Sequence, residues 1–155
     1  MRDATRWRAL LAACWLGALL TLAAVVTPAA FSTLAAADAG RLVGQLLARE
    51  AYLSLALGAV LLLLERQAAK IAAAQGTSSQ FGVGVALALA TLFCTVVGYF
   101  ALQPLMAEAR AGAGRWSFGQ LHAASAAFFG LKVLLVAALA WRAAVSPALV
   151  PSSSR

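Results

Sequence analysis

The chain has 155 residues, of which 63% are hydrophobic and 11% are charged, whereas ordinary globular domains carry about 25% charged residues. This composition, with a mean hydropathy of +0.88, excludes an ordinary soluble fold. The formal net charge of +7 does not indicate nucleic-acid binding, because the basic residues form no patch and stand mostly at the edges of apolar segments, where they meet anionic lipid headgroups.

The first apolar segment covers residues 9–30 and follows a basic head that contains Arg2, Arg6 and Arg8. A secretory signal peptide has a similar order, but its apolar region is only about 7–15 residues long. This segment is long enough to cross a hydrocarbon core of about 30 Å. The sequence therefore predicts an uncleaved transmembrane helix, with a cleaved signal peptide as the alternative.

The second predicted span, 42–64, contains the charged residues Arg49 and Glu50. The uncharged stretch 51–64 is too short to cross a bilayer alone. The helix is therefore expected to begin near Leu42, with both charges in the outer part of the membrane and Glu50 about two turns below the outer surface. Gly76 and the polar residues after it are expected to break the helix.

Two further spans are predicted at 82–104 and 120–142. The third carries no charge, whereas the fourth contains His122 near its start and Lys132 near its middle. The tail, 143–155, has two prolines and several serines and is expected to be mobile. The predicted fold class is all-α, with residues 1–142 forming one integral membrane four-helix bundle.

The arginines and lysines that flank these spans predict the orientation. Seven lie on the side that holds both termini and the second connection, and four lie in the other two connections, with Lys132 left out because it is intramembrane. By the positive-inside rule, both termini are expected in the cytoplasm.

Small residues recur at helical spacing in each span, as in membrane helices whose backbones approach closely. Together these rows of small residues favour a compact bundle, although some of them could instead form the contact between two copies in a dimer. The predicted packing positions are Gly17, Pro28, Gly40, Gly44, Gly58 and Gly98.

Charged residues inside a membrane span carry an insertion cost of about 2.5–3.5 kcal/mol, so they indicate a functional role by default. Glu50 is expected between His122 and Lys132 in depth. One interpretation is a functional polar cluster; the alternative is a structural pair in which Lys132 or His122 neutralises Glu50. The candidate cluster consists of Glu50, His122, Ser125, Lys132, Tyr99 and Gln103.

The sequence offers little support for a metal, a cofactor or catalysis. Cys14 and Cys94 each lie inside an apolar segment without a CxxC pattern. One histidine is too few for the three or four ligands of zinc or the two of bis-His haem. No P-loop, nucleophile elbow, HExxH or GxGxxG motif is present. We therefore expect no cofactor and no enzymatic activity.

A family resemblance extends over about residues 9–140 and is carried by Trp15, Gly17, Pro28, Phe31, Gly40, Gly44, Tyr52, Gln103, Pro104, Met106, Phe118, Leu121, His122 and Ser125. In the order of these residues the chain resembles the transmembrane protein 205-like family (domain of unknown function 4149). The similarity departs at Ala123, where the family often has glycine, and around Phe129 and Gly130, where an asparagine is common. It implies a four-helix membrane protein and no established activity.

Three functions remain open. The favoured one is a non-enzymatic, multi-pass protein of a bacterial inner membrane that binds a lipid, a second copy of itself or another membrane protein. The second is a small oligomeric transporter or channel subunit that uses the intramembrane Glu, His and Lys residues. The third is a membrane redox protein that handles haem or copper, which the single histidine disfavours.

Overall fold

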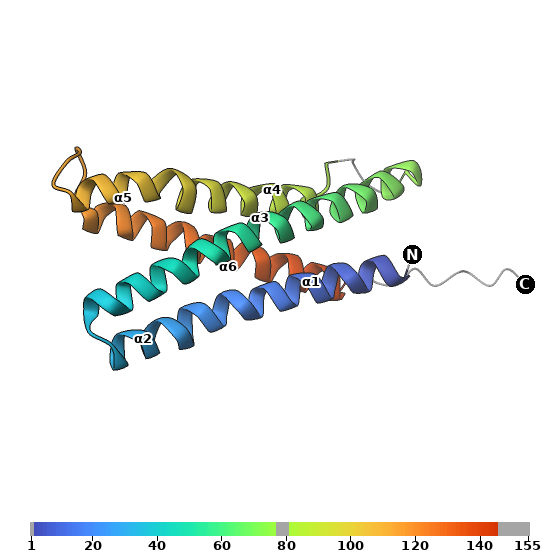
Figure 1. Ribbon diagram of the computed structural model, residues 1–155. Coiled ribbons are helices and arrows are strands. Elements are labelled where there is room, and N and C mark those ends of the chain that lie inside the picture. The colour runs from blue at the N-terminus through green and yellow to red at the C-terminus, as the bar shows by residue number, and fades with distance from the viewer. Residues whose placement is uncertain (1, 77–80, 146–155) are drawn as a thin grey trace, which may run out of the picture.

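The computed structural model describes residues 2–76 and 81–145, with side chains from residue 5 onward (Figure 1). The described residues are almost entirely helical and contain no strand. Four spans follow one another, two of them interrupted by a π-helix. In chain order the elements are α1 (Arg2–Thr21), η1 (π-helix, Leu22–Val26), α2 (Thr27–Thr33), α3 (Ala36–Ala74), α4 (Val83–Thr95), η2 (π-helix, Val96–Ala101), α5 (Leu102–Arg110) and α6 (Phe118–Val145).

Each span is long and apolar enough to cross a membrane, so the chain is a multi-pass membrane protein. The predicted spans fall on these helices, with the third starting one residue before Val83. The helices extend beyond the predicted limits, most of all at α3, which has 39 residues. Residues 77–80 of the predicted linker and 146–155 of the predicted tail lie outside the described residues.

The spans run alternately in opposite directions (Figure 1). α1 begins, α3 ends, α4 begins and α6 ends at one end of the bundle, which we call the terminal end. The α2–α3 turn and the α5–α6 loop lie at the opposite end, which we call the hairpin end. Toward the hairpin end, the first two spans diverge from the last two (Figure 1).

The densest packing lies in the half of the bundle nearer the terminal end. There α1 packs against α6 and α3 packs against α4. The side chains at this contact are apolar and almost fully buried, which favours association through van der Waals contact in lipid. They include Trp15, Leu19, Leu61, Val136 and Leu139.

The predicted packing positions divide into two groups. A Cβ added at Gly58 would lie 2.7 Å from Leu92 Cδ2, and one at Gly98 would lie 2.6 Å from Phe128 Cβ, so both glycines permit close helix contacts. At Gly17, Gly40 and Gly44, an added Cβ would meet no described atom within 4 Å. The prediction that these three glycines pack inside the bundle is therefore wrong.

Pro28 was also predicted to pack, but it is exposed. It is the second residue of α2, which follows η1 directly, and Pro104 stands in α5, shortly after η2. Proline has no backbone N–H and cannot donate to the carbonyl one turn earlier. That carbonyl belongs to a π-helix in both spans, so the two prolines account for the irregular turns, and such turns are frequent at functional sites.

Candidate functional site

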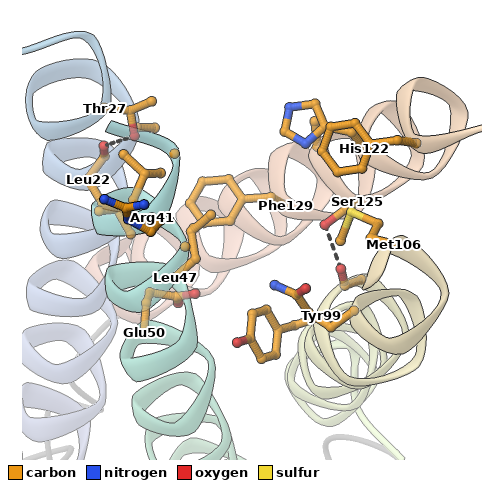
Figure 2. A pocket seen from close by; sticks show the side chains of 18 of the residues that line it. Leu22, Thr27, Arg41, Leu47, Glu50, Tyr99, Met106, His122, Ser125 and Phe129 are labelled. Atoms are coloured by element: carbon orange, nitrogen blue, oxygen red, sulfur yellow. Dashed lines mark hydrogen bonds between the residues drawn. The ribbon is translucent and has the colours of Figure 1, made fainter. Parts of the chain in front are cut away.

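A cavity of about 810 Å³ lies between the spans in the hairpin half of the bundle (Figure 2). All four spans contribute to its walls. Its volume falls within the range of about 300–1,000 Å³ that is typical of small-molecule sites. Exposed residues of its lining, such as Phe31, Gly40 and His122, lie near the hairpin end, so the cavity opens there.

The floor of the cavity is a buried ion pair between α3 and α6. Lys132 Nζ lies 2.7 Å from Glu50 Oε2 and 2.8 Å from Glu50 Oε1. Each residue is the fifteenth of its helix, and both helices begin at the hairpin end. The two charges therefore stand about 21 Å from the helix starts.

Hydrogen bonds from two neighbouring side chains complete the floor. Ser54 Oγ donates to Glu50 Oε1, and Ser54 Oγ accepts hydrogen bonds from Trp15 Nε1 at 3.1 Å and from Lys132 Nζ at 3.2 Å. Lys132 Nζ also lies 4.9 Å from the centre of the Phe129 ring. No buried polar side-chain atom in the described part of the chain lacks a partner. The floor is thus a neutral, fully bonded network that joins α1, α3 and α6.

All six residues of the predicted polar cluster line this one cavity. They do not form one bonded group. Ser125 Oγ donates to Gly98 O at 2.7 Å, which ties α6 to the π-helix η2. Tyr99 and Gln103 line the wall, and His122 stacks on Phe118 with the ring centres 5.7 Å apart (Figure 2).

The predicted depth of Glu50 needs correction, whereas Lys132, one of the two partners considered for Glu50, is the partner that the structure shows. Glu50 is level with Lys132 and does not lie between it and His122, because α3 begins at Ala36, six residues before the predicted start. Lys132 is the neutralising partner of Glu50, whereas His122 is exposed and lies ten residues, or about 15 Å, nearer the start of α6.

A smaller cavity of about 380 Å³ adjoins the first between α3 and α5, and we call it the side recess. Five residues line both spaces, namely Gly40, Arg41, Gly44, Gln103 and Arg110. Only Gln45 and Ala48 are added in the side recess. Its walls are therefore mainly polar and carry two guanidinium groups, in contrast to the largely apolar walls of the main cavity, which include Ala23, Leu47 and Phe129.

A second, partly buried ion pair was not predicted. Arg8 Nη2 lies 2.6 Å from Glu65 Oε1, which joins α1 to α3 near the terminal end. A Cβ on Gly84 would lie 2.6 Å from Glu65 Cδ, so this glycine makes room for the carboxylate. The sequence signal that could have indicated Glu65 was its spacing from Ser54 and Gly58, which places all three residues on one face of α3.

Arg41 and Arg110 were likewise missed as site residues, since in the sequence they stand out only as charges in the connections between spans. Trp15 and Ser54 were missed as partners of the ion pair. Ser54 lies four residues after Glu50, a spacing that brings both onto one face of a helix, and this signal could have found it. The pairing with Trp15 depends on the α1–α3 contact, which no local pattern reveals.

A group of three or more His, Cys, Asp or Glu side chains able to hold a metal is absent from the residues that the structure describes. The model of a family described as a domain of unknown function, DUF4149, matches residues 10–115. No curated protein matches the chain, and no solved structure matches it. The family match agrees with the resemblance to domain of unknown function 4149 and does not extend to the transmembrane protein 205-like name.

Proposed function

The chain belongs to the DUF4149 family, and we propose that it is a non-enzymatic membrane protein that binds a lipid in the cavity between its spans. The observation that carries this proposal is the cavity itself, which has about 810 Å³ of space, mostly apolar walls and an opening at the hairpin end. A lipid offers the matching shape, with an apolar chain for the cavity and a polar group for its mouth.

The closed floor supports binding over catalysis. A general acid, a base or a nucleophile must reach a reacting atom. The carboxylate of Glu50 accepts hydrogen bonds from Lys132 and Ser54, and the amine of Lys132 donates to Glu50 and Ser54. Neither group is left free to act on a ligand. In this arrangement the ion pair ends the cavity and holds three helices in register.

Selectivity in such a cavity would come from shape and polar contacts. Lipid chains are already in hydrocarbon, so moving one into an apolar cavity gains little from the hydrophobic effect. Close packing against rigid walls and bonds to the polar headgroup would have to distinguish the bound lipid from its bulk neighbours.

Native mass spectrometry of the purified protein in mild detergent tests the proposal. We expect the wild-type chain to retain lipid. Gly44→Leu should lose it, because a side chain there extends into open cavity space. Gly17→Leu is the matched control, since Gly17 is equally unobstructed but does not line the cavity. Equal lipid retention by all three proteins would contradict the proposal.

Transport is the second candidate, favoured by the intramembrane charges Glu50 and Lys132 on the cavity wall. A chain of four spans would have to oligomerise to enclose a pathway. Proton flux into proteoliposomes that is present in the wild type and lost in a folded Glu50→Gln variant would bring transport to the front. Absence of flux in both would leave the ion pair as a structural element.

We also propose that the protein resides in a bacterial inner membrane with both termini in the cytoplasm. The excess of basic residues at the terminal end supports this orientation. The hairpin end, with the mouth of the cavity, would then face the outer leaflet.

A further inference from the structure

The side recess differs from the main cavity in its chemistry. Its lining carries the guanidinium groups of Arg41 and Arg110 and the amides of Gln45 and Gln103, and it contains no carboxylate. The main cavity adds one acid, Glu50, whose charge is matched by Lys132. The two connected spaces thus form one amphiphilic volume whose polar part is cationic.

The two arginines are engaged only weakly within the chain. Arg41 bonds Asp38, but both side chains are largely exposed, at 76% and 52%, so solvent screens the pair. The guanidinium of Arg110 lies 4.5 Å from the centre of the Phe118 ring, a contact that leaves its N–H groups available to an anion. Asp38 offsets one of the two arginine charges, so Arg41 and Arg110 together leave an excess of positive charge at the mouth of the cavity.

The orientation rule does not account for these arginines. In the proposed orientation they lie on the outer side, where the rule predicts few basic residues. Arg41 and Arg110 nevertheless face one shared space from two different spans, α3 and α5. Binding of an anion therefore explains the position of these two arginines better than membrane orientation does.

We infer that the protein binds an anionic phospholipid, with the headgroup phosphate in the side recess between Arg41 and Arg110. The inference rests on the proposed function and adds the class of lipid. One acyl chain extends along the main cavity past Leu47 and Phe129 toward the floor at Glu50 and Lys132 (Figure 2). Guanidinium suits this role because its planar N–H groups match the oxygens of a phosphate.

A zwitterionic lipid would fit the same space less well. It carries a phosphate too, but its ammonium group would enter a recess that already holds two cations and offers no carboxylate. Repulsion between that ammonium group and the two guanidinium groups is expected to lower the affinity for the zwitterionic lipid by about tenfold.

The test is a lipid titration followed by native mass spectrometry, with delipidated protein and phosphatidylglycerol, phosphatidylcholine or inorganic phosphate as the probe. We compare the wild type, the double variant Arg41→Gln/Arg110→Gln and the cavity variant Gly44→Leu. Arg115→Gln is the matched control, because Arg115 lies in the α5–α6 loop at the same end but lines neither space. Circular dichroism and gel filtration establish that each variant is folded.

The wild type and Arg115→Gln should bind phosphatidylglycerol about tenfold more tightly than phosphatidylcholine. The double variant should bind both lipids equally, and Gly44→Leu should bind neither. If the wild type shows no preference while Gly44→Leu still abolishes binding, the headgroup inference fails and the proposed function stands. If phosphate alone competes as well as the lipid, the ligand is a free anion and the inference fails. If Gly44→Leu binds lipid like the wild type, both fail.

Discussion

Lys132 on α6 and Glu50 on α3 meet through contacts of 2.7 and 2.8 Å from the amine to the two carboxylate oxygens. The charges lie at equal depth and are both buried, so neither has to face lipid alone. An unpaired charge at this depth would carry a cost that the pairing removes. The pair therefore explains how two charged residues are accommodated in the middle of the bundle, and it closes the cavity on one side.

Removing one member of this pair should destabilise the fold more than removing both. We expect Glu50→Gln to lower the free energy of unfolding by about 3–5 kcal/mol, because Lys132 is left as an unpaired buried charge. The double variant Glu50→Leu/Lys132→Met should stay close to the wild type or exceed it. Unfolding in mixed micelles measures both variants. A double variant that loses as much stability as Glu50→Gln would contradict the account.

The two classes of glycine should respond differently to an added methyl group. Gly98→Ala places a Cβ 2.6 Å from Phe128 Cβ, so α6 must shift, and we expect a loss of about 1–3 kcal/mol. Gly17→Ala meets no described atom within 4 Å and should leave stability unchanged or slightly higher. Thermal unfolding of the two variants in one detergent is the comparison. Equal losses would show that the assigned contact at Gly98 is wrong.

The number and order of the spans could be predicted from sequence because crossing a bilayer requires about 20 apolar residues in a row. The confirmed all-α fold follows from that requirement alone. Helix ends were less predictable, since α3 continues into the alanine-rich residues before Leu42. This extension moved Glu50 from two turns to about four turns below the start of its helix and so brought it level with Lys132.

Side-chain contacts between spans could be predicted only in part. Glu50 and Lys132 were singled out because charge inside a span is rare. Gly40 and Gly44 form a GxxxG pattern that commonly indicates helix contact, yet here they face the cavity and the side recess. Glycines with the same spacing can lie either against a neighbouring helix or against open space, and only the tertiary structure shows which of the two applies.

The orientation of the bundle can be tested by labelling single cysteines with a membrane-impermeant maleimide. In a Cys14→Ala/Cys94→Ala background, we place one thiol at Trp116→Cys, in the exposed α5–α6 loop, and one at Gln67→Cys, toward the terminal end of α3. Positive-inside orientation predicts that intact cells label only the first. Labelling of the Gln67→Cys variant alone would reverse the assignment and place the mouth of the cavity on the cytoplasmic side.

The most direct test of the central claim, that the cavity holds a lipid, is photocrosslinking with a phospholipid that carries a diazirine in its acyl chain. After reconstitution and illumination, peptide mass spectrometry locates the adducts. We expect adducts on the cavity-lining residues Leu47 and Phe129 and their loss in Gly44→Leu. Adducts confined to outward-facing residues such as Leu63 and Leu134, unchanged in Gly44→Leu, would contradict the claim.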